Sequence, residues 1–303
     1  MNRYQVNLPK NDAELRAFVA RCDAEFEARM DEVVVRIAET PGLKMVGLTG
    51  PTCSGKTTTA RKLTECLKAH GHRVHVVSID DFYYDKDVLH ERAKADPDIE
   101  IDYDSEDTID VELLREKTES LLSGAPTEMP RFNFQTGYRE KGDTIAPEPD
   151  DVFLFEGIQV LYPKVASILN RGLYRSIYIA PLSEIEQGGE VFVPNRIRLL
   201  RRLVRDFRYR ASDPEFTLYL WKSVRANEEK NIFPNKQLCH EFIDSTMPCE
   251  LGMLKPYLEE LLPSVGENND FYHVAQTLLG TLEQIQTVPA SYMAENSLYK
   301  EFI

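Results

Sequence analysis

The sequence has no long apolar run. None of its 303 residues lies in a stretch approaching the roughly 18 consecutive apolar residues that a membrane-spanning helix needs. The first residues, MNRYQVNLPKND, also lack the apolar segment of an export signal. We therefore expect no membrane partner, no export and a cytoplasmic location.

Cysteine is scarce and follows no pattern. The five cysteines, at positions 22, 53, 66, 239 and 249, are odd in number and have no Cys-x-x-Cys spacing. This argues against a disulfide framework and against a cysteine-ligated zinc site. The spacing is typical of reduced thiols in a cytosolic protein.

Basic residues are in the minority. The chain has 36 Lys and Arg against 50 Asp and Glu, a formal net charge of −14 at pH 7. Because a surface of this average charge repels polyanions, we expect no nucleic-acid partner. The 42% hydrophobic and 28% charged composition is that of a globular protein, and 303 residues are enough for one substantial core with extra helices or for two small domains.

Apolar periodicity separates a core from two additions. Residues 11–40 have apolar side chains at three- and four-residue spacing, which predicts one long amphipathic helix with Asn11 and Glu14 as its capping box. Beyond it, β-branched and apolar runs alternate with helical patterns, which predicts an α/β fold with a central parallel sheet. The expected strands are 44–49, 73–79, 151–155 and 175–179, and the expected helices 55–69, 110–122 and 195–210.

These patterns set the expected domain limits. Residues 1–42 form an N-terminal helical extension, 43–250 the core, and 251–303 C-terminal helices and a tail that packs on the core. The last segment, Ser291–Ile303, ends in Phe302-Ile303 and is expected to dock on the core or on a second subunit. A homo-oligomer is therefore one expectation.

A phosphate-binding loop is the strongest local signal. Gly50-Pro51-Thr52-Cys53-Ser54-Gly55-Lys56-Thr57 fits G-x-x-x-x-G-K-[ST] between a predicted strand and a predicted helix. Backbone N–H groups and the start of the helix would converge on phosphate oxygens. Lys56 would reach the β- and γ-phosphates and Thr57 would ligate Mg²⁺. The loop predicts binding of a nucleoside triphosphate with Mg²⁺, ATP or GTP, and a three-layer α/β/α P-loop NTPase fold.

Two carboxylates end predicted strands. Asp80 follows the run 73–79, where a carboxylate could accept the proton of an attacking hydroxyl. Glu156 follows the run 151–155 and could hold Mg²⁺ directly or through water. The alternatives are an Asp that only caps a loop and a solvated Glu at a strand end. Next to a phosphate-binding loop, the pair favours phosphoryl transfer.

An arginine-rich helix is predicted in a chain that is otherwise acidic, with seven arginines between Arg196 and Arg210. Apolar residues of this helix form a packing arc: Leu199, Leu200, Leu203, Val204 and Phe207. The opposite side is lined by Arg198, Arg202 and Arg205. We expect a closing lid, about residues 195–235, whose arginines face a triphosphate. The alternative is an arginine face paired with the acidic segment 80–110.

Seven motifs follow one another between residues 44 and 263: GPTCSGKTT, SIDDFYYD, DYDSEDTID, MPRFNFQTGYR, VFLFEGI, RRLVRDFRYR and NIFP. In this order they resemble the uridine kinase and phosphoribulokinase family of P-loop kinases. FNFQTGYRE and NSLYKEFI resemble a bacterial branch labelled nucleoside or uridine kinase. The resemblance implies an ATP- and Mg²⁺-dependent kinase acting on a hydroxyl of a small molecule, first of all the 5′-hydroxyl of uridine or cytidine.

The resemblance also implies residue roles. Asp80 corresponds to the catalytic base, with Lys56 and Arg205 as further catalytic residues, and Asp104 to the carboxylate that binds ribose hydroxyls. The implied metal site consists of Thr57, Glu156 and Asp80. The implied acceptor site consists of Asp80, Tyr83, Asp104, Phe132, Arg139 and Arg202. The implied nucleotide site consists of Gly50, Pro51, Thr52, Cys53, Ser54, Gly55, Lys56, Thr57, Thr58, Arg205 and Arg210.

The chain departs from the family where uridine-cytidine kinases hold the pyrimidine. In their segment P-x-Y-D-F-x-x-H-x-R, the Tyr, Asp and His positions are Phe132, Asn133 and Gly137 here. Ser212 stands where the family has a further arginine. Because lost hydrogen bonds alter selectivity, a sugar phosphate, a pantothenate-like alcohol or another polyol stays open as the acceptor. A nucleotide-dependent switch without an acceptor is a third hypothesis.

Overall fold

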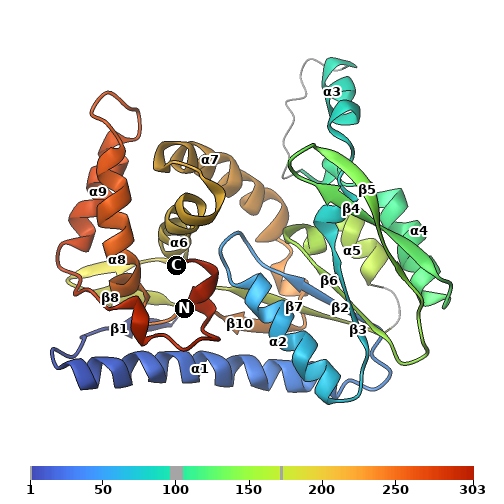
Figure 1. The fold of residues 1–303 in the computed structure, drawn as a ribbon, viewed down its shortest axis with the longest axis horizontal. Helices are drawn as coiled ribbons and strands as arrows, with labels where there is room; N and C mark the ends of the chain where they lie inside the picture. The colour runs from blue at the N-terminus through green and yellow to red at the C-terminus, as the bar shows by residue number, and fades with distance from the viewer. Residues whose placement is uncertain (1, 96–104, 171–172) are drawn as a thin grey trace.

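The computed structural model describes residues 2–95, 105–170 and 173–303, and its centre is a parallel sheet (Figure 1). Its strands are β2 (Met45–Thr49), β3 (Val74–Ser78), β6 (Val152–Glu156), β7 (Tyr174–Ala180) and β10 (Glu241–Asp244). They lie in the order β10-β7-β2-β6-β3, with every neighbouring pair parallel. The four strands expected from the sequence are confirmed. The edge strand β10 was not foreseen, because its four residues, EFID, carry no apolar run.

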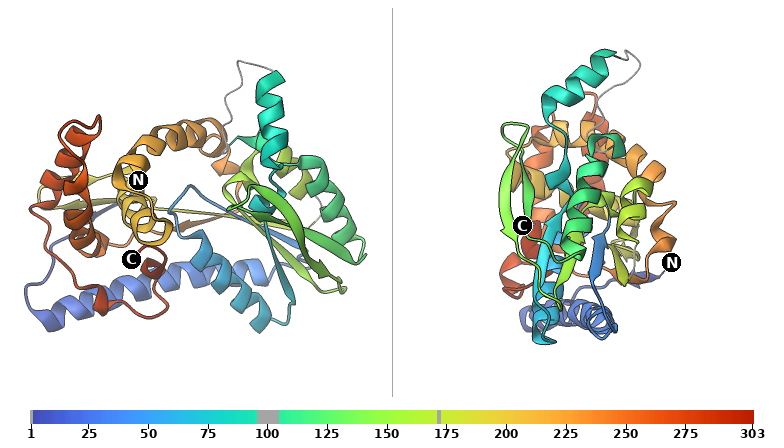
Figure 2. Two further views of the ribbon diagram at one scale, coloured as in Figure 1. Left: turned by 45° about the horizontal axis from the view of Figure 1, so that its top comes forward. Right: turned by 90° about the vertical axis from the view of Figure 1, so that its right-hand side faces the viewer.

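Helices cover both faces of this sheet, which confirms the three-layer α/β/α arrangement. The alternation of β2 explains the two layers, since Met45 belongs to one buried cluster and Val46 and Leu48 to the other. On the side of Val46 lie α1 (Asp12–Ala38) and α2 (Lys56–Ala69), and on the side of Met45 lie α4 (Val111–Leu122) and α5 (Pro163–Leu169). Helix α1 runs beneath α2 in Figure 1 and in the left view of Figure 2, the two views that show α1 along its length.

Smaller elements surround the sheet. An antiparallel hairpin, β4 (Thr127–Asn133) and β5 (Tyr138–Ile145), follows α4. The start of the chain adds a strand, β1 (Arg3–Gln5), to a second sheet with β8 (Glu184–Gln187) and β9 (Glu190–Phe192), which the sequence did not indicate. The further α-helices are α3 (Lys86–Ala95), α6 (Pro194–Arg210), α7 (Pro214–Asn227), α8 (Glu250–Leu261) and α9 (Tyr272–Leu282).

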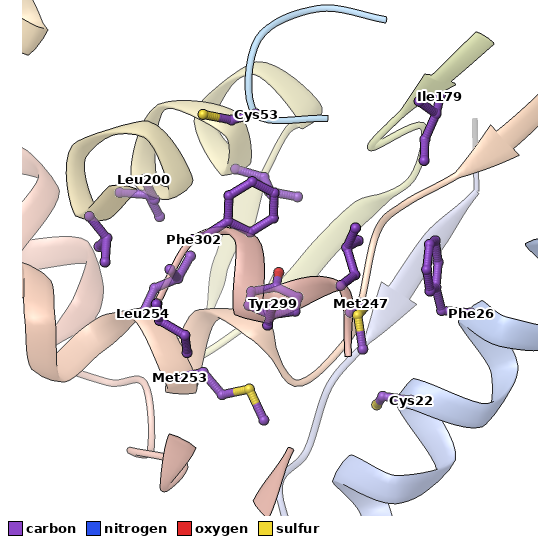
Figure 3. Packing of buried hydrophobic residues seen from close by; sticks show 14 of the residues in the cluster. Cys22, Phe26, Cys53, Ile179, Leu200, Met247, Met253, Leu254, Tyr299 and Phe302 are labelled. Carbon is purple, nitrogen blue, oxygen red and sulfur yellow. The ribbon is translucent and has the colours of Figure 1, made fainter. Parts of the chain in front are cut away.

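The two ends of the chain pack on the core. Asn11 caps α1, since its side chain accepts hydrogen bonds from the N–H groups of Ala13 and Glu14. At the other end, Tyr299 and Phe302 lie among buried residues of several helices (Figure 3). Of the two dockings expected for the tail, the structure places it on its own core. Within the described residues, none of the helices has the length and apolarity to cross a bilayer.

The arginines of helix α6 are arranged differently from the expectation, because two of them are buried in ion pairs. Arg198 was expected on a face turned away from the core, but it is fully buried and pairs with Glu228, with Nη1 2.6 Å from Oε1. Arg201 is equally buried and pairs with Glu250, with Nε 2.8 Å from Oε2. Phe207, expected in the packing arc, is 45% exposed. The alternative pairing with segment 80–110 is wrong for these two arginines, since their partners come from the region after residue 227.

We expect the buried ion pair between Arg201 and Glu250 to be important for stability. Glu250→Gln keeps the side-chain shape but leaves a buried guanidinium without its counter-charge, so the free energy of unfolding should fall by about 3 kcal/mol. The control is Glu65→Gln, which removes an exposed pair with Arg61 and should change it by less than about 1 kcal/mol. Urea unfolding measures both, and equal losses would contradict the expectation.

Candidate functional site

Three neighbouring strands bring the candidate residues to one edge of the sheet. β2 runs into the loop 50–55, β6 ends at Glu156, and β3 is followed by Asp80. Pairing places Glu156 opposite Leu48 on one side and Ser78 on the other. The Ser78 hydroxyl donates a hydrogen bond to Glu156 Oε1 at 2.7 Å. Asp80 lies two residues beyond the last residue of β3, in a 3₁₀ turn (Ile79–Phe82), not at the end of the strand itself.

The loop is tightly packed against the sheet. A Cβ atom added at Gly50 would lie 2.0 Å from the carbonyl oxygen of Ile179, so only glycine fits there. The Lys56 ammonium folds back across the loop and donates to the carbonyl oxygens of Gly50 and Pro51, at 2.9 and 3.1 Å. Burial lowers the pKa of Lys56, while the nearby carboxylate of Glu156 opposes that shift.

A cavity of about 1020 Å³ opens at this edge. It brings together many of the residues that the sequence singled out: Thr52, Cys53, Lys56, Thr57, Asp80, Tyr83, Phe132, Glu156, Arg202, Arg205 and Arg210. The other loop residues belong to the same turn and the start of α2: Gly50, Pro51, Ser54, Gly55 and Thr58. Asp104 lies outside the described residues. The Arg139 side chain pairs with Asp110, Nη1 to Oδ2 at 3.0 Å, and is not among the described residues that line the cavity.

Asp80 has an amide partner that the sequence did not reveal. The buried Gln159 donates from Nε2 to Asp80 Oδ1 at 2.8 Å and to the Tyr83 hydroxyl at 2.9 Å. Burial raises the pKa of Asp80, and the hydrogen bond from Gln159 opposes the rise. In the sequence, Gln159 differs from its neighbours only in being a polar residue inside the apolar run Ile158–Leu161, and this was the signal that could have identified it.

Aromatic side chains form a second part of the cavity wall. The rings of Tyr83 and Phe132 have centroids 5.4 Å apart, and Phe134 lies 5.1 Å from Phe132. The hairpin that carries Phe132 and Phe134 is fixed to the turn after β3, because the Phe132 N–H donates to Asp81 Oδ1 at 2.9 Å. Of the two adjacent carboxylates, Asp80 therefore lines the cavity, and Asp81 fixes the position of the hairpin that carries Phe132 and Phe134.

One buried carboxylate orients the arginines of the cavity. Asp206 accepts from Arg202 Nε at 3.0 Å and from Arg205 Nη2 at 2.6 Å, and Arg210 Nε lies 3.7 Å away. Asp206 is 3% exposed. Three guanidinium groups around one carboxylate leave an excess of positive charge, which suits a phosphate. The i to i+4 spacing from Arg202 to Asp206 was available as a signal in the sequence.

The oxygen groups at the edge fit a magnesium ion that arrives with a nucleotide. No three His, Cys, Asp or Glu side chains gather into a metal cage in the part of the chain that the structure describes. Thr57 and Glu156 offer oxygen ligands in the same cavity. This suits Mg²⁺, which takes one or two protein oxygens and completes its shell with phosphate oxygens and water.

Burial affects the acid–base properties of Glu156 as well. Desolvation raises the pKa of Glu156, while the hydrogen bond from Ser78 and the charge of Lys56 oppose the rise. A cation bound beside this carboxylate would favour its charged form for the same reason that Lys56 does.

Comparison with known proteins agrees with this geometry. Residues 45–251 match the model of the Phosphoribulokinase / Uridine kinase family. The chain is 31% identical to the uridine kinase of Halobacterium salinarum, over 63% of this chain and 76% of that one. It is 29% identical to the uridine kinase of Staphylococcus haemolyticus, over 78% of this chain and 96% of that one.

A solved structure supports the fold. This structure is of a kinase from Silicibacter sp. TM1040 that is provisionally named a fructose transport system kinase. The TM-score is 0.52 and the sequence identity is 22%, and the match covers 72% of this chain and 98% of the Silicibacter chain. The chain thus belongs to the phosphoribulokinase and uridine kinase family, and is a phosphotransferase with the P-loop kinase fold that uses ATP and Mg²⁺ to phosphorylate an alcohol group.

Proposed function

We propose that this protein is a nucleoside kinase that transfers the γ-phosphate of ATP to the 5′-hydroxyl of uridine, cytidine or a related nucleoside. The observation that carries the proposal is a single cavity lined by the phosphate-binding loop, by Asp80 and by the rings of Tyr83, Phe132 and Phe134. A triphosphate would meet the loop there, an acceptor hydroxyl would meet Asp80 as a general base, and a flat nucleobase would meet the aromatic rings.

The nucleotide would bind at the loop and the start of α2. N–H groups there would hold phosphate oxygens, and Lys56 would exchange its two carbonyl partners for the β- and γ-phosphates. Thr57 and Glu156, with Asp80 nearby, would hold Mg²⁺, which neutralises charge on the phosphates. Arg202, Arg205 and Arg210 would stabilise negative charge on the phosphoryl group in transfer.

Asp80 would accept the proton of the acceptor hydroxyl. Gln159 holds Oδ1, so Oδ2 is the oxygen that would face the hydroxyl. As the hydroxyl oxygen bonds to the γ-phosphorus, its proton passes to Asp80, the bond to the bridging oxygen breaks, and ADP leaves. A pKa raised by burial brings Asp80 closer to the range in which a base accepts a proton effectively.

The aromatic wall would hold the nucleobase. Stacking on Phe132 and Phe134 needs only a flat ring, and it would replace contacts that Tyr and His make at the positions of Phe132 and Gly137 in the uridine-cytidine kinases. Such a wall distinguishes poorly between bases, because a π face is common to all of them. We therefore propose that the acceptor is a nucleoside and that the site selects only weakly between nucleobases.

A phosphorylated acceptor is the second candidate, and Lys86 is the observation that favours it. Lys86 lines the cavity, and its side chain would lie 2.9 Å from a Cβ atom added at Gly137. Its ammonium lies over the Tyr138 ring, 4.7 Å from the ring centroid, and would supply a positive charge for the phosphate of such an acceptor. Faster turnover of a sugar phosphate than of uridine or cytidine would favour this candidate.

The role of Asp80 can be tested with Asp80→Asn. ADP formation that depends on uridine or cytidine should fall by about 10² or more, because the general base is lost, while ATP affinity stays nearly unchanged. The control is Asp107→Asn on the exposed surface, which should retain full turnover. If Asp80→Asn turns over like the wild type, Asp80 is not the base. If no hydroxyl compound stimulates ADP formation by the wild type, the nucleoside kinase proposal fails.

The role of Gln159 can be tested with Gln159→Met, which keeps the volume but removes the N–H donor. The hydrogen bond from Gln159 favours charged Asp80, so its loss should raise the pKa of Asp80 further. A base is active only when deprotonated, so the acid limb of the kcat/KM profile should move to higher pH. A loss of activity by the same factor at every pH, with the limb unmoved, would show that Gln159 acts only on the fold.

A further inference from the structure

The end of the chain reaches the phosphate-binding loop. The carboxylate of Glu301 accepts two hydrogen bonds from Thr58, from the backbone N–H and from the hydroxyl, each 3.1 Å long and both at Oε2. Thr58 lies in the first turn of α2, and Glu301 lines the same cavity as Lys56 and Thr57. A negative charge from a residue 243 positions later is thus placed at the start of the helix proposed to bind phosphates.

Residues 297–303, here called the C-terminal strap, are anchored at several points. Ser297 Oγ donates to Asp23 Oδ1 of α1 at 2.6 Å. Leu298 covers the loop, since its Cδ1 would be 2.4 Å from a Cβ atom added at Gly55. The strap therefore packs against the phosphate-binding loop on one side and α1 on the other.

Arg201 links the strap to the loop a second time. Its guanidinium lies 5.4 Å from the ring centroid of Tyr299 and 5.0 Å from that of Phe302, and it donates to the carbonyl oxygen of Cys53 at 3.2 Å. Both rings are fully buried (Figure 3). The position of Glu301 is consequently set by a packed structure and not by a loose chain end.

The contacts of Glu301 conflict with those of a nucleotide. The N–H groups in the first turn of the helix after such a loop are donors for phosphate oxygens. A carboxylate oxygen and a phosphate oxygen cannot accept from the same N–H in the same place, and their like charges repel. Glu301 is half-buried, whereas its neighbours Tyr299 and Phe302 are fixed in the core. Turning away the Glu301 side chain therefore disturbs less packing than moving the strap.

We propose that Glu301 competes with the phosphates of ATP for Thr58, and that the C-terminal strap thereby sets the nucleotide affinity of this kinase. In the nucleotide-free protein the Glu301 carboxylate holds the Thr58 donors. When ATP binds, the carboxylate releases them. The inference rests on the proposed role of the loop in binding the triphosphate.

The test is the Kd of Mg·ATP, measured by titration calorimetry on the full chain. Glu301→Gln removes the charge and keeps the size, so Kd should fall about tenfold, which corresponds to about 1.4 kcal/mol. The matched control is Glu295→Gln, the same substitution at an exposed position just before the strap, and its Kd should equal that of the wild type. Glu301→Ala is a second variant in case the first does not fold, and its Kd should also fall.

Two outcomes would overturn the inference. An unchanged Kd means that Glu301 does not compete, and a higher Kd means that Glu301 assists nucleotide binding, for example beside the metal. If instead the wild type binds no Mg·ATP, it is the proposed nucleotide site that fails. The two failures are therefore distinguishable in one series of titrations.

Discussion

The parallel pairing of β2 with β6 and of β6 with β3 positions the residues of the site. It places Glu156 between Leu48 and Ser78, and so brings the loop after β2, the end of β6 and the turn after β3 to one edge. A shift of β6 by one residue against its neighbours would turn Glu156 to the opposite face of the sheet and break its hydrogen bond with Ser78. Lys56, Glu156 and Asp80 line one cavity because this register holds.

Helix α6 uses arginines in two different ways. Arg198 and Arg201 are buried with Glu228 and Glu250, and they donate to the carbonyl oxygens of Thr52 and Cys53, at 3.2 Å each. They hold the loop from the side of the core. The arginines around Asp206 face the cavity, where their charge is available to a phosphate. One helix thus supports the loop and supplies the cations proposed to act with it.

Local patterns in the sequence were sufficient for the central strands, the loop and the helix after it, and they also indicated Asp80 and Glu156. Each of these features is encoded within about ten residues by alternation, glycine and a polar strand end. The burial of Arg198 was not predictable, because its partner Glu228 lies 30 positions away and periodicity carries no information on such pairs. The same reason explains why the contacts of Gln159 and Glu301 were missed.

The proposed reaction requires that a hydroxyl compound and a triphosphate meet at Asp80. This meeting can be observed in a crystal structure with Mg²⁺, a non-hydrolysable ATP analogue and uridine. We expect the triphosphate on the loop amides, the nucleobase of uridine stacked on Phe132, and the 5′-oxygen of uridine about 3 Å from Asp80 Oδ2. Uridine bound outside the cavity, or an Asp80 carboxylate turned away from every hydroxyl, would contradict it.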